Sequence, residues 1–187
     1  MRPLPRAFFA RSALVVAREL LGAILVHRRG ESLRCGVVVE TEAYLGERDL
    51  ASHASKGRTA RTDVMFGPPG HAYVYLIYGM HHCMNVVCER EGTASAVLLR
   101  GLAPLRGIPP DIRTDGPGRL ARALGITLAH NRLDLCAGQL TLAAGNRVAP
   151  RRVARGPRIG VDYAGAWAAK PYRFFVRGDP GVSAPRG

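Results

Sequence analysis

The sequence has few acidic residues and almost no lysine. Among its 187 residues, 14 are acidic and 27 are basic, which leaves a formal net charge of +13, and only Lys56 and Lys170 are lysines. A positive surplus of this size indicates a polyanionic partner such as nucleic acid. Arginine suits such a partner because its guanidinium contacts phosphate bidentately, although a biased nucleotide composition also enriches arginine.

Cysteine and long apolar runs are equally scarce. The four cysteines, at positions 35, 83, 88 and 136, form neither a CxxC pair nor a regular framework, which argues against a zinc ribbon or a disulfide scaffold. No run of about 18 apolar residues occurs, as a membrane-spanning helix would require. Arg18 and Glu19 interrupt the apolar stretch near the N-terminus before it could form a secretory signal. We therefore expect a soluble intracellular protein with no cofactor.

The length and the apolar content are those of one globular domain. With 187 residues, 47% of them hydrophobic, one core suffices, and we expect a single domain over residues 1–187. The spacing of apolar residues predicts helices over residues 12–21 and 118–124. β-rich runs predict strands over residues 23–27, 33–43, 72–78, 84–88, 96–100, 139–142 and 158–163. Residues 45–70 are typical of a functional loop, and the Gly- and Pro-rich residues from about 178 predict a frayed tail.

Two of the rare carboxylates stand on one predicted strand. If the strand over residues 33–43 continues, Glu40, Glu42 and Tyr44 share one face, because side chains alternate between the two faces of a sheet. A glutamate at the end of an apolar strand can act as a general base for a water nucleophile, since burial and neighbouring charges tune its protonation. The plainer interpretation is a glutamate that faces solvent or pairs with an arginine.

Three of the six tyrosines lie in one segment. Tyr73 and Tyr75 share a strand face, and Tyr78 stands beside Gly79 at the turn of a predicted hairpin. A hairpin tip is narrow enough to enter the minor groove of DNA, where an inserted side chain fills the gap left by an extruded nucleotide. Aromatic pairs also stabilise sheets without binding anything, and we expect this structural role for Tyr73.

The histidines and cysteines near this segment favour no metal site. His81, His82 and Cys83, together with Cys88 and His53, include the imidazole and thiolate groups that bind zinc. Adjacent strand residues point to opposite faces, however, and no second spaced pair completes four ligands. Asn85 either hydrogen-bonds the edge of a base or satisfies a neighbouring backbone group, and spacing does not decide between the two.

Several segments together resemble the alkyladenine (3-methyladenine) DNA glycosylase family. The sequence VETEAYLG over residues 39–46 is followed by His53, by YVYLIYGM over residues 73–80, by Asn85 and by LLR over residues 98–100. The resemblance continues through GPGRL at 116–120, RIGV at 158–161 and WAAKP at 167–171. Each motif alone is weak, but their joint order and spacing cover nearly the whole chain and are specific.

The resemblance implies a monofunctional DNA repair glycosylase. Such an enzyme flips an alkylated or deaminated purine, of the 3-methyladenine, hypoxanthine and ethenoadenine class, out of double-stranded DNA and hydrolyses its N-glycosidic bond, leaving an abasic site. Glu42 matches the general base that activates the attacking water, and Arg100 matches the arginine that holds this carboxylate and the water. A lyase step would need an amine nucleophile, and neither Lys56 nor Lys170 falls at a motif position.

The resemblance also implies how the damaged base is recognised. Tyr44, His53 and Tyr75 match the walls of the base pocket, and His53 also matches a contact to the edge of the base. Tyr78 matches the tyrosine that intercalates into the duplex. Asn85 matches the residue that disfavours normal guanine by obstructing its exocyclic amine.

The implied fold is a compact α+β domain around a curved antiparallel sheet, with the hairpin of Tyr78 protruding from a basic face. We expect a monomer in the bacterial cytoplasm, at the nucleoid, with damaged double-stranded DNA as its partner and no membrane association. The main alternative is a non-catalytic basic nucleic-acid-binding module, such as a structural RNA-binding protein. Glu42 argues against it, because a pure binder gains nothing from a buried carboxylate facing phosphate. An enzyme acting on free nucleosides would need neither the charge nor Tyr78 at a hairpin tip.

Overall fold

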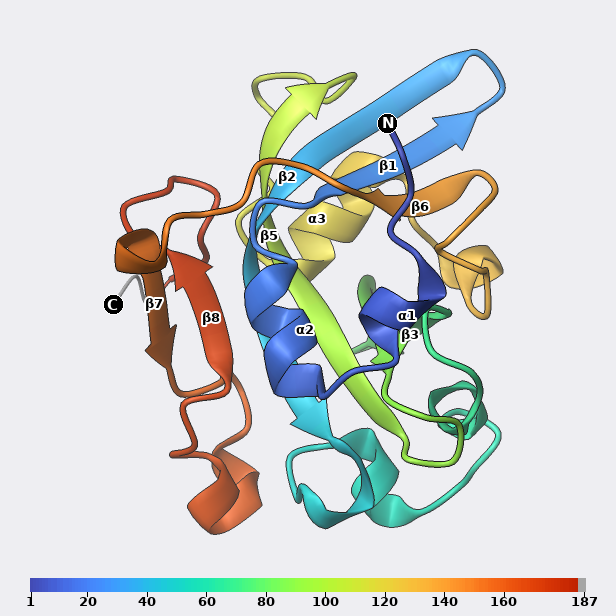
Figure 1. The fold of residues 1–187 in the computed structure, drawn as a ribbon, viewed down its shortest axis with the longest axis vertical. Helices are drawn as coiled ribbons and strands as arrows, with labels where there is room; N and C mark the ends of the chain where they lie inside the picture. Colours follow the sequence, from blue (N-terminus) through green and yellow to red (C-terminus); the bar gives the residue numbers. More distant parts are fainter. Residues whose placement is uncertain (185–187) are drawn as a thin grey trace.

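Eight strands form one sheet, and the helices pack on its two faces (Figure 1). In the computed structural model, which describes residues 1–184, the strands are β1 (Ile24–Arg29), β2 (Ser32–Leu45), β3 (Ala72–Ile77), β4 (His81–Cys88), β5 (Ser95–Arg106), β6 (Leu140–Ala143), β7 (Val153–Gly156) and β8 (Arg173–Val176). The order is β3-β4-β5-β2-β1-β6, while β8 pairs with both β2 and β7. Their pairings are antiparallel, so the chain is a single α+β domain with a mainly antiparallel sheet.

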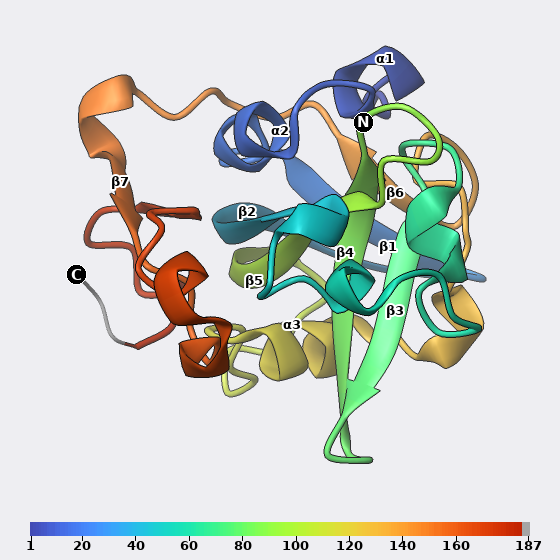
Figure 2. The ribbon, with the colours of Figure 1, turned by 90° about the horizontal axis from the view of Figure 1, so that it is seen from below.

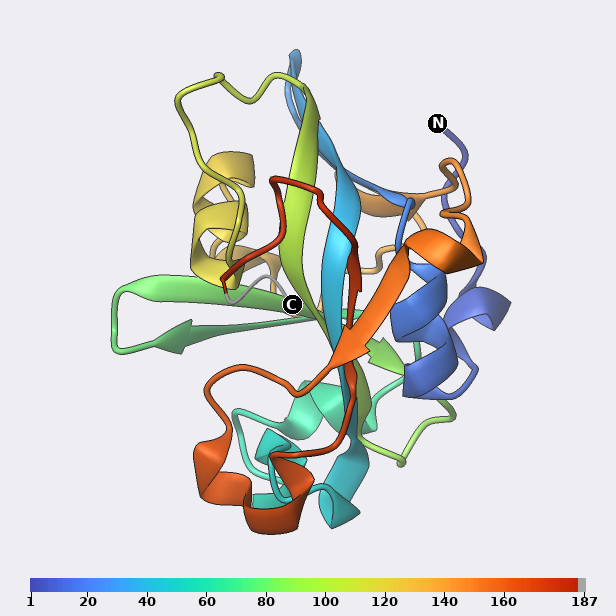
Figure 3. The same ribbon diagram turned by 90° about the vertical axis from the view of Figure 1, so that its left-hand side faces the viewer.

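Among residues 1–184, three α-helices and six short 3-10 helices complete the domain. The α-helices are α1 (Arg6–Phe9), α2 (Ala13–Glu19) and α3 (Pro117–Leu124), and the 3-10 helices are η1 (Gly46–Arg48), η2 (His53–Lys56), η3 (Asp63–Phe66), η4 (Leu128–His130), η5 (Pro150–Arg152) and η6 (Asp162–Trp167). Figure 3 shows α1 and α2 on one face of the sheet and α3 on the other. Within the described residues, no helix is both long enough and apolar enough to cross a membrane.

The two long central strands, β2 and β5, position the site. Strand β2 pairs with β1 over its first half and with β8 over its second half, while β5 runs along its other edge. The register between β2 and β5 shifts on both sides of Glu40, which marks a bulge at this residue. Glu40 and Glu42 are two residues apart and share one face of β2, where both contact Arg100 of β5.

Strands β3 and β4 form a hairpin that projects from the body of the domain, as Figure 2 shows. The predicted strands over residues 23–27, 33–43, 72–78, 84–88, 96–100 and 139–142 and the two predicted helices are confirmed with small shifts of their ends. The strand predicted over residues 158–163 is wrong: this stretch is a loop that runs into η6. Gly160 has a φ of +74°, a left-handed conformation that ends an extended run.

The C-terminal segment, which its composition predicts to be frayed from about residue 178, is packed as far as Ser183. Val182 and Ser183 are buried, and Gly181 lies against β5 so closely that a Cβ there would be 2.4 Å from the carbonyl oxygen of Leu102. Glycine here permits a close backbone approach rather than disorder, which explains why composition alone misleads. Residues 185–187, the end of the expected tail, lie outside the described residues.

We expect Gly181→Ala to lower the free energy of unfolding by about 1–3 kcal/mol, the usual cost of over-packing, because the added Cβ would meet the backbone of β5. Gly156→Ala is the matched control, since its Cβ would make only an ordinary contact, 3.9 Å from the ring of Phe175. Urea unfolding measures both variants. Equal stabilities would contradict the close packing of the C-terminal segment.

Candidate active site

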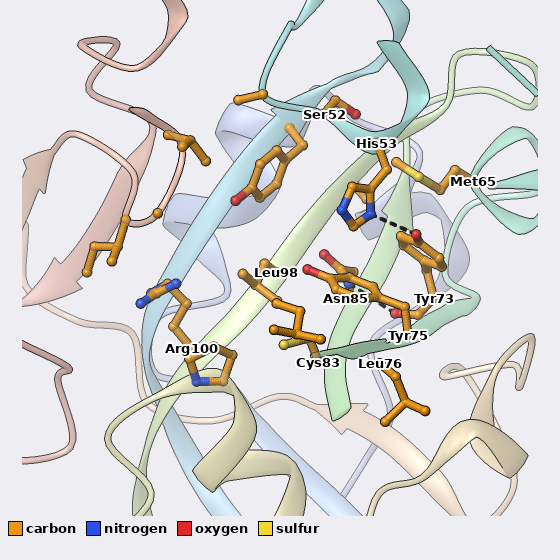
Figure 4. Close-up of a pocket in the computed structure, with 18 of the residues that line it drawn as sticks. Ser52, His53, Met65, Tyr73, Tyr75, Leu76, Cys83, Asn85, Leu98 and Arg100 are labelled. Atoms are coloured by element: carbon orange, nitrogen blue, oxygen red, sulfur yellow. Dashed lines mark hydrogen bonds between the residues drawn. The ribbon is translucent and has the colours of Figure 1, made fainter. Parts of the chain in front are cut away.

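A pocket of about 330 Å³ opens where the hairpin, β5 and two loops meet (Figure 4). Six of the seven residues implied by the resemblance line it: Tyr44, His53, Tyr75, Tyr78, Asn85 and Arg100. The seventh, Glu42, is fully buried behind the pocket wall and contacts Tyr44, Arg100 and the backbone of Ile159. The structure therefore brings all seven residues to one place.

Glu42 is held by donors on both of its oxygens. The hydroxyl of Tyr44 donates to Oε2 at 2.8 Å, the amide of Ile159 donates to Oε1 at 2.8 Å, and Nε of Arg100 lies 3.4 Å from Oε1. Burial and then the charge of Glu42 raise the pKa of Tyr44 well above its usual value, so the phenol keeps its proton and donates it. All three partners stabilise a negative charge on the carboxylate.

Glu40 lies on the same side of β2 and shares Arg100 with Glu42, which confirms that the two carboxylates share one face. Its Oε1 accepts hydrogen bonds from Nε of Arg100 at 3.0 Å and from Nε of Arg173 at 2.7 Å. Ser183 donates to it twice, from Oγ to Oε1 at 2.8 Å and from the backbone amide to Oε2 at 2.7 Å. The plainer interpretation, a glutamate paired with arginine, is therefore correct for Glu40.

A buried ion pair between Arg158 and Asp49 fixes the loop that supplies the Ile159 amide. Nη2 of Arg158 donates to Oδ1 of Asp49 at 2.8 Å, and its Nη1 donates to the carbonyl of Ala43 at 2.9 Å. The guanidinium also lies over the ring of Tyr44, 4.7 Å from its centroid. Both charges are fully buried, so either one without the other would be strongly destabilising. This pair connects the 158–161 loop to the strand that carries Glu42.

The other side of the pocket is aromatic, and Arg61 also lines it, with its guanidinium 5.0 Å from the centroid of the Tyr75 ring. His53 packs edge-on against Tyr75, with 4.6 Å between ring centroids, and its Nδ1 lies 2.8 Å from the hydroxyl of Tyr73. Burial, assisted by the charge of Arg61, lowers the pKa of His53 to about 4. Tyr73 is buried and lines the pocket as well, so it combines a packing role with a place in the wall. At neutral pH this wall therefore presents a neutral imidazole.

Asn85 and Tyr78 occupy very different environments at this wall. Asn85 is buried beneath the pocket, and its Nδ2 donates to the carbonyl of Tyr73 at 3.0 Å, which is one of the two alternatives left open by the sequence. Tyr78, at the hairpin tip, is 88% exposed and has a φ of +52°, and Met80 beside it is 70% exposed. A left-handed backbone costs a residue with a side chain about 1–2 kcal/mol. The tip is thus strained and presents large apolar side chains to solvent.

The pocket contains no group of metal ligands. Within the described part of the chain, no three His, Cys, Asp or Glu side chains are grouped so that they could hold a metal ion. Of the residues considered for zinc, His81 is exposed at the hairpin end whereas Cys83 is buried in the pocket wall. Burial raises the pKa of the Cys83 thiol to about 11, so it remains protonated at neutral pH.

Known proteins are similar in sequence to this chain over nearly its whole length. The family model described as methylpurine-DNA glycosylase matches residues 7–180. The chain belongs to the methylpurine-DNA glycosylase family. A relative from Myxococcus xanthus, named "Putative 3-methyladenine DNA glycosylase", is 62% identical over 183 residues, which cover 98% of this chain and 94% of that protein. A relative of the same name from Legionella pneumophila (strain Corby) is 50% identical, and the match covers 98% of this chain and 99% of that protein. Another from Anaeromyxobacter dehalogenans (strain 2CP-C) is 53% identical, and the match covers 97% of this chain and 87% of that protein.

Several residues around the pocket of this methylpurine-DNA glycosylase family member belong to no motif in the sequence. Asp49, Arg158, Arg173 and Ser183 surround the two glutamates, yet only Arg158 falls in a segment that the family resemblance singled out. One signal was available for Arg173, because an arginine that starts the apolar run RFFV needs a buried carboxylate as partner. Ser183 lies in a stretch whose composition favours disorder and gives no such signal.

We expect His53 to make stability depend on pH in the acid range. Its folded pKa of about 4 lies below its unfolded value of 6.5, so between these values the unfolded chain binds more protons and the free energy of unfolding falls as the pH falls. His53→Asn should make this fall shallower between pH 6.5 and 4. Urea unfolding of both proteins at stepped pH measures the difference, and parallel curves would show that His53 does not titrate in this window.

Proposed function

We propose that this protein is a 3-methyladenine DNA glycosylase of base excision repair, which releases alkylated or deaminated purines from double-stranded DNA by hydrolysis of the N-glycosidic bond. Family membership over residues 7–180 and the names of the relatives support the activity. The observation that carries the proposed mechanism is a fully buried glutamate, Glu42, held beside an aromatic pocket in a chain of net charge +13.

Glu42 has the properties of a general base for water. Each of its oxygens accepts one hydrogen bond, and a carboxylate oxygen can accept two, so capacity remains for the proton of a water. As that water attacks the anomeric carbon, its proton passes to Glu42, and the electrons of the glycosidic bond leave with the purine. The negative carboxylate also stabilises the positive charge that develops on the sugar. Arg100 offsets the cost of keeping this buried carboxylate ionised.

The aromatic wall suits a purine that carries a positive charge. A protonated His53 would repel a methylated, cationic base, whereas a pKa of about 4 keeps the imidazole neutral at physiological pH. The faces of Tyr44 and Tyr75 can contact a flipped base by stacking and, for a cationic base, by cation–π attraction. A charged purine is also a good leaving group, so no general acid is needed for this class of lesion.

Selection and extrusion of the base are assigned to Asn85 and Tyr78. Asn85 is fixed by its bond to the Tyr73 carbonyl, so its side chain cannot easily move aside for the exocyclic amine of guanine. Tyr78 stands on a projecting hairpin and is almost fully exposed, which suits insertion into the duplex in place of the flipped nucleotide. Its strained backbone supports a functional role, because the residue adds nothing to the core.

The partner is damaged double-stranded DNA, which the net charge of +13 favours as a polyanion. With this substrate, we propose a monomer that acts at the nucleoid in the bacterial cytoplasm. The competing function, a non-catalytic nucleic-acid-binding module, shares the charge and the tyrosines. It differs in one respect: binding alone would not depend on the acid–base chemistry of Glu42.

Glu42→Gln should abolish base release while leaving duplex binding nearly intact, because the amide keeps the shape but cannot take a proton from water. The loss should be at least about 100-fold, the lower range for general acid–base catalysis. Duplexes with a single hypoxanthine or 3-methyladenine, treated with alkali to cleave abasic sites, report the release. Glu47→Gln, an exposed glutamate in η1, is the matched control. Turnover near wild type by Glu42→Gln would exclude this base and favour the binding module.

Tyr78→Ala should weaken binding to a lesion-bearing duplex by about 1–3 kcal/mol, the usual contribution of one stacked aromatic. The reason is that nothing then fills the gap that the flipped nucleotide leaves. Fluorescence of a base analogue at the lesion site measures the flipped fraction. Excision from single-stranded DNA serves as the internal control and should be unchanged, because a single strand has no such gap. A wild-type flipped fraction would reduce Tyr78 to an ordinary surface residue.

A further inference from the structure

Glu40 is a fully buried carboxylate to which the proposed mechanism gives no task. It accepts four hydrogen bonds, from Arg100, from Arg173 and twice from Ser183. The donors are also joined to one another: Nη2 of Arg100 lies 3.3 Å from Oγ of Ser183, and Nη2 of Arg173 donates to the Ser183 carbonyl at 3.1 Å. Glu40 and Ser183 therefore stand at the centre of a closed network with two arginines.

This network determines how Arg100 meets Glu42. The single Nε–H group of Arg100 donates to Glu40 at 3.0 Å, whereas Nε lies 3.4 Å from the nearer Glu42 oxygen. A guanidinium without these restraints favours a two-pronged hydrogen bond with a carboxylate, which would occupy both oxygens of Glu42. Held as it is, Arg100 supplies positive charge and leaves the Glu42 oxygens to Tyr44, to Ile159 and to a water.

The C-terminal segment delivers Ser183 to this position from far along the chain. Gly181 packs against Leu102 of β5 and against Val39 of β2, and a Cβ at Gly101 would be 2.2 Å from the carbonyl oxygen of Gly181. In Figure 3 the segment after β8 runs back beside β2 and β5 toward the C-terminus. These close backbone contacts fix the position of the C-terminal segment along β2 and β5, and so place Ser183 beside Glu40.

We propose that Ser183 and Glu40 are positioning residues of the glycosylase reaction, which act through Arg100 on the base Glu42. The proposal rests on the proposed function and adds the C-terminal segment to the active site. Glu40 sets the direction of the Arg100 guanidinium, and the Ser183 hydroxyl connects the two. Neither residue touches the DNA; their effect on the rate passes through the placement of one positive charge.

Ser183→Ala tests this most cleanly, because it removes the hydroxyl but keeps the backbone bond to Glu40. We expect single-turnover base release to slow about tenfold, with the affinity for the lesion-bearing duplex unchanged. Ser95→Ala is the matched control: Ser95 lies on β5 with Arg100, is fully buried, and its Oγ has no hydrogen-bond partner among the described residues. Release by Ser95→Ala should stay at the wild-type rate. Ser183→Cys, which keeps the volume, should slow release in the same way even if Ser183→Ala folds poorly.

A double-mutant cycle with Arg100→Lys separates positioning from a merely structural role. Lysine keeps the charge but lacks the groups that contact Glu40 and Ser183, so in this background Ser183→Ala should slow release no further. The proposal is overturned if the Ser183 variants release base at the wild-type rate, or if Ser183→Ala slows release equally in both backgrounds. Failure of the wild-type protein to release any base would instead overturn the proposed function, and the positioning role with it.

Discussion

Two carboxylates buried side by side on one strand share one arginine, and the rest of the site is arranged around that constraint. Glu40 and Glu42 are both fully buried, and Arg100 lies within 3.4 Å of each. Because a buried charge is costly without partners, the second cation, Arg173, must come from β8. Hydrogen bonds come from the loop at Ile159, which donates to Glu42, and from Ser183 of the C-terminal segment, which donates to Glu40. The strand bulges at Glu40 itself.

The pocket has an ionic side and an aromatic side. On the β2–β5 side, two buried carboxylates share Arg100. On the hairpin side, the rings of His53, Tyr73 and Tyr75 pack together, and Arg61 also lines this wall, with its guanidinium 5.0 Å from the centroid of the Tyr75 ring. In the proposed reaction the aromatic side would contact the purine, and the ionic side would stabilise the positive charge that develops on the sugar.

Local patterns predicted the parts of this site that depend on local geometry. Alternation along β2 placed Glu40 and Glu42 on one face, and the Tyr-rich hairpin could be read from its turn. The contacts Asp49–Arg158, Glu40–Arg173 and Glu40–Ser183 join residues 109 or more positions apart, and no periodic pattern encodes such pairs. Two glycines account for the predictions that were wrong. Gly160 has a left-handed backbone where a strand was expected, and Gly181 belongs to a packed segment whose composition predicted disorder.

Glu42 is proposed to act as a base whose negative charge is stabilised by the neighbouring guanidinium of Arg100. Single-turnover release of 3-methyladenine from a duplex isolates this interaction, because a cationic lesion needs no general acid. Arg100→Gln keeps a polar side chain but removes the cation, so it should slow release by more than about tenfold while the affinity for the lesion-bearing duplex stays near that of the wild type. Release at the wild-type rate by Arg100→Gln would show that Glu42 works without this cation.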